Sequence, residues 1–314
     1  MVFIEKEAKQ LRQYQTQRQF TASARAATKL LLRERAGMDG RGILLPAYIG
    51  LSKVEGSGVF DPVRETDIPF AFYAVSDRLI PDLGDIKAQL ETGNFQIVFL
   101  IHYFGIAQVD IGSFVEMCHS YGAIVIEDCA HTLLGGLGTR RLGSFGDYSI
   151  FSIHKSISTQ DGGFFIDRSS VLPNPTPDMA STISLSSLAT FANTNLESIS
   201  IRRKENYARV ASHVKDSAVL ELFWPHIDEY SVPLNCPVIV PNGKREALYF
   251  RLIELGILPT ALYHTLIPEI SAEQFPDSHH VANNILNLPT HPDISDADFE
   301  IYFSALTKAV REII

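Results

Sequence analysis

The sequence predicts an α/β protein with a mainly parallel central sheet flanked by helices. Short apolar runs at residues 43–45, 97–101 and 123–126 lack strict alternation of polar and apolar residues, which is typical of strands covered on both faces. Between the last two runs, residues 109–121 carry apolar side chains at helical spacing, which indicates a strand–helix–strand unit. A chain of 314 residues is long enough for one large α/β domain and a smaller one.

The remaining elements divide the chain into two parts. Further strands are predicted at residues 69–75, 148–153 and 163–166. The stretch 168–195 is rich in Ser, Thr, Pro and Asn, and we interpret it as a connection between domains. Patterns of a second domain follow at residues 201–214, 232–240, 245–255 and 296–313. We therefore predict a large α/β domain at residues 1–190 and a smaller α+β domain at residues 191–314.

Composition excludes several classes of protein. A formal net charge of −9 argues against nucleic-acid binding, because phosphate backbones are held by excess Lys and Arg. Cys118, Cys129 and Cys236 lie far apart without paired metal spacing, so the sequence predicts no disulfide framework and no metal site, and a reducing compartment fits best. No apolar stretch approaches the length of a membrane span, and the amino terminus lacks a signal-peptide pattern. We expect a soluble, cytoplasmic protein.

Asp128 is the first candidate site residue. It directly follows the apolar run 123–126 and Glu127, which places a carboxylate at the carboxyl end of a buried strand, where open α/β sheets bind ligands. One suitable partner is a protonated pyridine nitrogen, whose charge the carboxylate would stabilise so that the ring acts as an electron sink. The alternative is a helix N-cap, since Asp before Cys-Ala-His-Thr is a plausible helix start.

Lys155 is the second candidate. It follows the apolar run 148–153 and precedes a loop that ends at Gly162 and Gly163. Partial burial and neighbouring cations lower the pKa of a lysine, which supplies the neutral amine that Schiff-base formation needs. The alternative is a solvated loop lysine, the commoner situation for this residue type.

A helix start near the amino terminus is a candidate phosphate site. Residues 20–32 form a small-residue turn capped by Ser23 that enters an apolar helix. Unpaired N–H groups and the positive end of the helix dipole both favour an anion at such a place. The alternative is a capped helix without a ligand.

Taken in order, these segments resemble the DegT/DnrJ/StrS family of sugar aminotransferases that depend on pyridoxal 5′-phosphate (PLP). The matching motifs are His-Tyr-Phe-Gly at 102–105, Glu-Asp-Cys-Ala-His at 127–131, Gly-Ser-Phe-Gly-Asp at 143–147, Phe-Ser-Ile-His-Lys at 151–155, and Asp-Gly-Gly at 161–163. Two outer motifs also match, Leu-Leu-Pro-Ala-Tyr at 44–48 and Leu-Pro-Thr-His at 288–291. The resemblance implies the PLP-dependent transferase fold of type I.

The resemblance also implies roles for individual residues. Lys155 would carry PLP as a Schiff base, and Asp128 would hold its pyridine nitrogen. His131 would contact the ring or its phenolic oxygen, and Ser152 would bind the phosphate. Ala24 and Arg25 stand where the family's backbone amides cradle phosphate, although the family usually has Gly-Thr there.

For substrates, the resemblance implies amino transfer from glutamate to a nucleotide-linked keto sugar, in a homodimer whose subunits complete each other's sites. His154, Arg202 and Arg203 are the candidate substrate-binding residues. A diphosphate needs local cations in an acidic chain, and Arg25, Arg202 and Arg203 are the candidates for these contacts. Surface arginines are the alternative interpretation of these three residues.

Two departures from the family keep other functions open. His154 and Lys155 are adjacent here, whereas most members separate them by two residues, but Lys155 keeps the usual distance of seven residues to Gly162. The Gly-x-Asn-x-Arg segment that serves the neighbouring subunit is absent between residues 167 and 201. The alternatives are a PLP-dependent sugar dehydratase, in which a histidine replaces the lysine, and a non-catalytic relative that binds PLP or another ligand. A nicotinamide-binding enzyme is disfavoured because no G-x-G-x-x-G motif follows an early strand.

Overall fold

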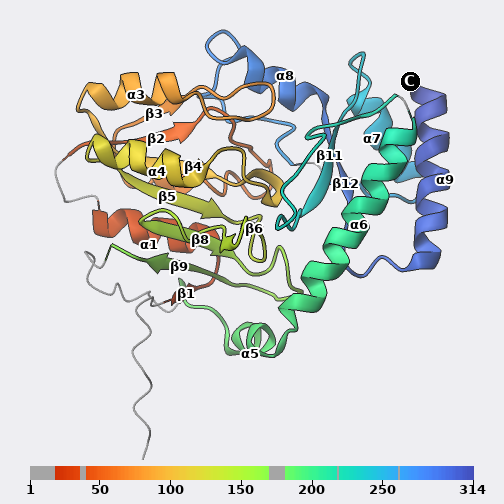
Figure 1. The fold of residues 1–314 in the computed structure, drawn as a ribbon, viewed down its shortest axis with the longest axis horizontal. Helices are drawn as coiled ribbons and strands as arrows, with labels where there is room; N and C mark the ends of the chain where they lie inside the picture. Colours follow the sequence, from red (N-terminus) through yellow and green to blue (C-terminus); the bar gives the residue numbers. More distant parts are fainter. Residues whose placement is uncertain (1–17, 36–39, 170–180, 218, 261) are drawn as a thin grey trace, which may run out of the picture.

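A seven-stranded sheet forms the larger half of the protein (Figure 1). The computed structural model describes residues 18–35, 40–169, 181–217, 219–260 and 262–314. In spatial order, the strands are β1 (Arg18–Thr21), β9 (Gly163–Asp167), β8 (Tyr148–Ser152), β5 (Ile124–Cys129), β4 (Phe95–Ile101), β2 (Gly42–Pro46) and β3 (Phe70–Tyr73). The five strands from β8 to β3 are parallel, and β9 is antiparallel to both of its neighbours. The predicted mainly parallel sheet is confirmed.

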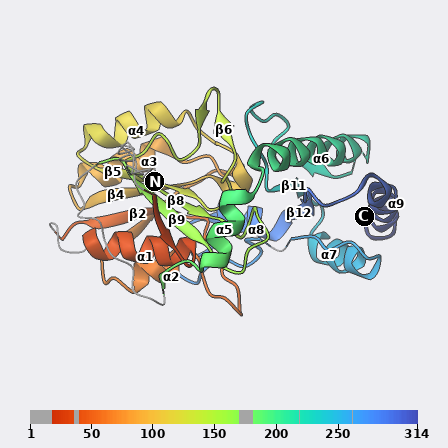
Figure 2. The ribbon, with the colours of Figure 1, turned by 90° about the horizontal axis from the view of Figure 1, so that it is seen from below.

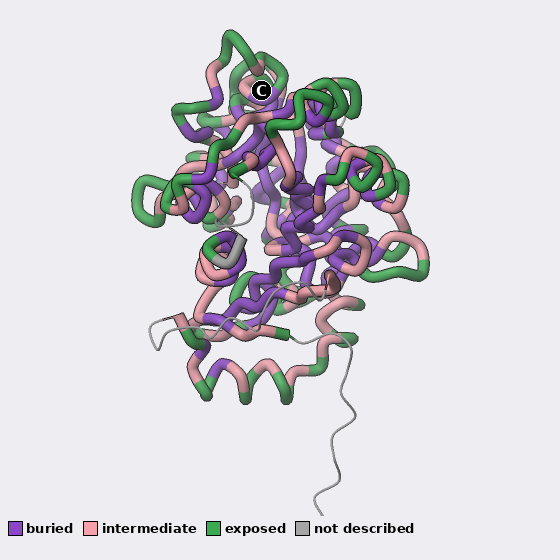
Figure 3. Tube along the Cα trace, turned by 90° about the vertical axis from the view of Figure 1, so that its left-hand side faces the viewer, coloured by how far each residue is buried: buried purple, intermediate pink, exposed green. Residues whose placement is uncertain are grey.

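Helices cover both faces of this sheet. Figure 2 shows α3 (Leu83–Glu91) and α4 (Ile111–Ser120) on one face, and α1 (Ala24–Arg35) and α2 (Phe60–Arg64) on the other. α4 begins where the side chain of Asp110 accepts a hydrogen bond from the N–H of Ser113 at 2.7 Å, and its apolar residues are buried at helical spacing. Because both faces are covered, the central strands β2, β4, β5 and β8 are mostly buried, and Figure 3 shows buried residues concentrated inside the molecule.

A second, antiparallel sheet lies in the carboxyl-terminal part of the chain. It consists of β10 (Glu221–Leu222), β11 (Asn235–Ile239) and β12 (Ile285–Pro289), accompanied by α6 (Leu196–Ser217), α7 (Arg245–Glu254) and α9 (Asp296–Ile313). These elements share an apolar core of their own. The predicted α+β character of this part is confirmed, while the boundary at residue 190 stays a prediction.

The structure corrects the interpretation of the connecting segment. It contains α5 (Leu185–Asn193), whose first turn is capped by Ser184, with the side chain accepting a hydrogen bond from the N–H of Ser187 at 3.2 Å. Serines of this kind favour helix ends as well as loops, so composition alone concealed the helix. Residues 170–180 of the segment lie outside the described residues, as do residues 1–17.

Part of the carboxyl-terminal half packs against the larger sheet. Leu266, Ile267 and Ile270 belong to its apolar core, and α8 (Pro276–Asn284) contributes Val281. The short elements η1 (Tyr103–Gly105), β6 (Gly136–Leu137) and β7 (Arg140–Arg141) complete the described structure. No helix among the described residues has the length and apolar character needed to cross a membrane.

The topology gathers several chain segments at one edge of the larger sheet. The parallel strands β5 and β8 end there, and β1 runs in the same direction as β8 because both are antiparallel to β9. The start of α1 therefore reaches the same edge. Gly163 makes this approach possible, because a Cβ atom there would lie 2.3 Å from the amide nitrogen of Ala24.

Candidate active site

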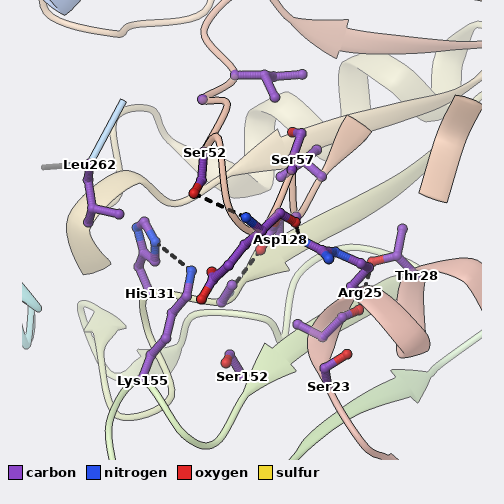
Figure 4. Close-up of a pocket in the computed structure, with 18 of the residues that line it drawn as sticks. Ser23, Arg25, Thr28, Ser52, Ser57, Asp128, His131, Ser152, Lys155 and Leu262 are labelled. Carbon is purple, nitrogen blue, oxygen red and sulfur yellow. Dashed lines mark hydrogen bonds between the residues drawn. The ribbon is translucent and has the colours of Figure 1, made fainter. Parts of the chain in front are cut away.

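A cavity of about 640 Å³ opens at this edge of the sheet (Figure 4). The predicted residues that line it are Ala24, Arg25, Asp128, His131, Ser152, His154 and Lys155. The segment 49–59 forms another part of its wall, and Tyr263 reaches it from the carboxyl-terminal half. Sequence reasoning missed this segment, although its Gly and Ser residues at 56–58 indicate a loop that can approach a ligand closely.

Lys155 and His131 face one another in the cavity (Figure 4). The Nζ atom of Lys155 lies 3.0 Å from Nε2 of His131, and Nδ1 of His131 accepts a hydrogen bond from the N–H of Phe104 at 3.2 Å. Since Nδ1 accepts, a neutral imidazole carries its proton on Nε2. That N–H then points at Nζ, which can accept it only as a neutral amine.

The surroundings of both groups favour the same protonation state. Desolvation by the cavity walls lowers the pKa of Lys155, although its side chain keeps accessible surface where it projects into the cavity, and the nearby Asp128 acts in the opposite direction. Burial lowers the pKa of His131 well below its usual value, and the charge of Lys155 adds to this effect. Both pKa shifts act toward the neutral forms, and the geometry of the contact fits a neutral amine beside a neutral imidazole.

Asp128 lies at the carboxyl end of β5 and is only 8% exposed. Its Oδ1 atom accepts a hydrogen bond from the N–H of Ala130 at 2.8 Å, within a turn. No helix begins there, so the N-cap interpretation is wrong. Burial raises the pKa of Asp128, and no lysine, arginine or histidine forms an ion pair with it in the described part of the chain. A buried carboxylate in this position lacks a cationic partner.

The first turn of α1 and the end of β8 form the opposite wall. Ser23 caps α1 as predicted, since its Oγ atom accepts a hydrogen bond from the N–H of Ala26 at 3.1 Å. The first N–H groups of a helix have no carbonyl partner within the helix, so those of Ala24 and Arg25 are available at the cavity. Arg25 is held by the Glu55 carbonyl, to which its Nη2 donates at 2.6 Å, and Ser152 is buried beside them.

Glu127 is a structural residue that sequence reasoning did not assign. Adjacent residues of a strand point to opposite faces, so Glu127 lies away from the cavity that Asp128 enters. Its oxygens accept hydrogen bonds from the backbone N–H groups of Gly143, Phe145 and Gly146 at 2.7–2.8 Å. His102 lies 2.9 Å away through Nε2. The carboxylate therefore fixes the loop that leads into β8.

The two predicted arginines of α6 lie in different places. Arg203 is buried and lines a second cavity of about 270 Å³, which also contacts Lys155 and His131. Arg202 lines neither of the two cavities; its Nη2 donates to the carbonyl of Ile294 at 2.9 Å and pairs with Asp296 at 3.2 Å. The structure thus brings Arg203 to the site and leaves Arg202 at the surface of the second sheet.

Comparison with solved structures identifies the fold as that of the PLP-dependent aminotransferases. The aminotransferase TlmJ from Streptoalloteichus hindustanus superposes with a TM-score of 0.77 at 20% identity, over 94% of this chain and 86% of the other. A putative sugar aminotransferase from Streptococcus pneumoniae, in its PLP form, gives 0.78 at 17% identity, over 95% of this chain and 88% of the other. The predicted fold class is confirmed.

Residues 71–174 match the model of the DegT/DnrJ/EryC1/StrS aminotransferase family. The GDP-perosamine synthase of Vibrio cholerae is 31% identical over 98 residues, and that of Escherichia coli O157:H7 is 30% identical over 92 residues. These matches cover 31% and 29% of this chain but only 26% and 25% of the two synthases. The predicted resemblance to the family is confirmed, and it rests on the segment that carries Asp128 and Lys155.

Proposed function

We propose that this protein is a PLP-dependent aminotransferase that moves an amino group from glutamate to a nucleotide-linked keto sugar. The observation that carries the proposal is the contact of the Lys155 Nζ atom with Nε2 of His131 at 3.0 Å, in a cavity at the carboxyl edge of the sheet. A lysine without such a contact would be protonated near neutral pH and could not attack a carbonyl carbon. The family match and the names of the two relatives support the substrate class.

The residues of the cavity fit PLP. Asp128 would hold the pyridine nitrogen, whose positive charge is the partner that the buried carboxylate lacks. Ser152 and the N–H groups of Ala24 and Arg25 would hold the phosphate, and His131 would contact the ring or its phenolic oxygen. PLP, when bound, acts as the electron sink that makes amino transfer possible.

The protein's own groups would bind the cofactor and carry protons. Lys155 would attach PLP through its neutral Nζ atom and, once released, would accept and return a proton at that atom. His131 would keep the amine oriented, because its tautomer is fixed by the N–H of Phe104. Asp128 would remain ionised beside a positively charged ring nitrogen, in spite of its burial.

Borohydride trapping tests the role of Lys155. We expect reduction of the PLP-loaded protein to leave a pyridoxyl group on the peptide that contains Lys155, as found by mass spectrometry. Lys155→Ala should abolish both this adduct and amino transfer, whereas Lys53→Ala, which changes an exposed lysine of the segment 49–59, should preserve them. An adduct on a different lysine of the wild-type protein would overturn the assignment.

Substrate class is tested in two half-reactions. Glutamate should first remove the visible absorption of the loaded protein, and a panel of nucleotide-linked keto sugars should then restore it. Restoration by simple keto acids but by no sugar would refute the sugar substrate while leaving an aminotransferase. Failure of glutamate to change the spectrum, with PLP attached to Lys155, would favour a dehydratase or a non-catalytic relative.

We also propose that the protein acts as a cytoplasmic homodimer. Leu185 on α5 is 84% exposed, and Ile201 on α6 is 52% exposed, so this region carries apolar surface that a second copy would cover. The segment 185–195 would then help to complete the neighbouring site. Sedimentation should find a two-chain species, and a PLP-loaded, active monomer would contradict the proposal.

A further inference from the structure

The second cavity contains a buried arginine that forms no ion pair with any of the described residues. Arg203 is only 2% exposed, and its Nη1 atom donates to the carbonyl of Leu234 at 3.0 Å, while its buried Nε atom has no hydrogen-bond partner among the described residues. Asp293 attracts it electrostatically, but no Asp or Glu of the described residues lies within ion-pair distance. Burial of a guanidinium is costly unless an anion compensates its charge.

The rest of the cavity wall is also free of negative charge. Its described lining has no Asp or Glu and consists of His131, Lys155, Arg203, Leu234, Asn235, Thr260, Leu262, Pro289, Thr290 and His291. In a chain with a formal net charge of −9, a cavity that contains a buried arginine and no acidic side chain is a local exception. Burial lowers the pKa of Arg203 to about 10, which still leaves it charged near neutral pH.

The size and position of the second cavity limit which anion can bind at Arg203. The cavity volume of about 270 Å³ is below the roughly 300–1,000 Å³ typical of pockets for drug-sized ligands, so a whole nucleotide-linked sugar does not fit inside it. A small carboxylic acid does. Lys155 and His131 line this cavity as well as the larger one, so a ligand bound at Arg203 lies next to the amine that we propose to hold PLP.

We infer that Arg203 and the cavity around it bind a carboxylate group of the amino donor, an inference that rests on the proposed function. α6 brings Arg203 to the cavity, the start of β11 brings Asn235, and the segment after β12 brings Thr290. The Nδ2 atom of Asn235 is buried and has no hydrogen-bond partner among the described residues. Like Nε of Arg203, it is a donor on this wall that lacks an acceptor. A carboxylate supplies both the missing charge and acceptor oxygens.

Arg202 provides a matched control for Arg203. Both arginines belong to α6, but Arg202 binds the Ile294 carbonyl and Asp296 and lines neither cavity. The probe is glutarate, a dicarboxylate of the length of glutamate that has no amino group to transfer. Its affinity for the PLP-loaded protein is measured by titration calorimetry, with GDP titrated in parallel as an anion from the other substrate.

Glutarate should bind the wild-type protein and Arg202→Gln equally, and Arg203→Gln at least tenfold more weakly. Far-UV circular dichroism and the cofactor spectrum check that the variant is folded. Two further variants give a test that does not depend on Arg203→Gln: Arg203→Lys should keep part of the affinity, and Asn235→Asp, which places a negative charge in the cavity, should weaken binding at least tenfold.

Equal glutarate affinity in the wild type, Arg203→Gln and Asn235→Asp would overturn the inference, as would GDP binding that depends on Arg203 while glutarate binding does not. Its failure is separable from that of the proposed function. If glutamate still converts the loaded protein with an unchanged KM in Arg203→Gln, the aminotransferase stands and the subsite is wrong. If glutarate binds through Arg203 but glutamate causes no conversion, the subsite stands and the aminotransferase is wrong.

Discussion

Replacing Glu127 by glutamine should destabilise the protein although the side chain barely changes shape. In the wild type, Oε1 accepts hydrogen bonds from the N–H groups of Phe145 and Gly146. Oε2 accepts one from the N–H of Gly143 and lies 2.9 Å from Nε2 of His102. Glutamine replaces one oxygen by an NH₂ group, which donates and does not accept. Either orientation of the amide therefore puts donors against donors.

The magnitude follows from counting the N–H groups that lose their acceptor. With the NH₂ group at the Oε1 position, two backbone N–H groups are left unpaired. At the Oε2 position, His102 can move its proton to Nδ1 and accept through Nε2, so only the N–H of Gly143 is left. Each unpaired buried donor costs about 1–3 kcal/mol, so the favoured orientation of Glu127→Gln should cost at least this amount. Total stabilities of about 5–15 kcal/mol make such a loss easy to measure.

Urea unfolding followed by circular dichroism gives the free energy of unfolding for the comparison. Glu116→Gln is the matched control, because Glu116 is exposed on α4 and the change should shift stability by less than about 0.5 kcal/mol. If Glu127→Gln also stays within that limit of the wild type, then the four contacts of the carboxylate do not stabilise the fold in the way argued.

The hydrogen bonds of Glu127 also predict how the destabilisation by Glu127→Gln depends on pH. Burial alone would raise the pKa of Glu127, but the hydrogen bonds from His102, Gly146 and Gly143 hold it below its ordinary value. A depressed folded-state pKa contributes stability that is complete above the unfolded pKa, here about 4.5, and is lost as the pH falls through the folded pKa. The difference in unfolding free energy between wild type and Glu127→Gln should therefore be full near neutral pH and shrink on acidification. A difference that grows in acid would contradict the assignment.

Two further predictions concern the cavity. Asp128→Asn should keep the shape of the site and bind PLP, yet lower turnover at least a hundredfold, about 2.7 kcal/mol of barrier, and near-native turnover would exclude the pyridine-partner role. His131→Phe removes the N–H that favours the neutral form of Lys155, so the pKa of the amine should rise. The pH midpoint for attachment of PLP, followed by its absorbance, should then move upward, and an unchanged midpoint would refute the tautomer argument.

Much of the fold could be predicted because the central strands are apolar on both faces. The runs at 97–101 and 148–153 correspond to β4 and β8 with small differences at their ends. α5 and α8 were not predicted: α5 lies in a segment whose Ser, Thr, Pro and Asn content indicated a loop, and α8 is rich in His and Asn with few apolar positions. Such helices form because a neighbouring core covers one side of them, and sequence periodicity does not report that neighbour.

For the candidate site, too, the sequence predicted some residues and not others. Asp128 and Lys155 could be predicted because the rule for strand ends and the family motifs both point to them. The roles of Glu127 and Arg203 depend on partners distant in the chain, Gly143 to Gly146 for the first and Leu234 for the second. Arg202 and Arg203 are adjacent and chemically identical, so only the packing of α6 determines which of them is buried beside Lys155.

The placement of charged groups around Lys155 explains how a protein with a net negative charge could bind an amino donor that is itself negatively charged. Asp128 lines the larger cavity, where a cationic ring nitrogen would offset it, and does not line the second cavity. Arg203 lines only the second cavity, where a carboxylate would offset it. Lys155 borders both cavities, and its lowered pKa favours the form that would add no charge to either of them. A cofactor nitrogen and a donor carboxylate would then be drawn to different walls, which orients both groups around the same amine.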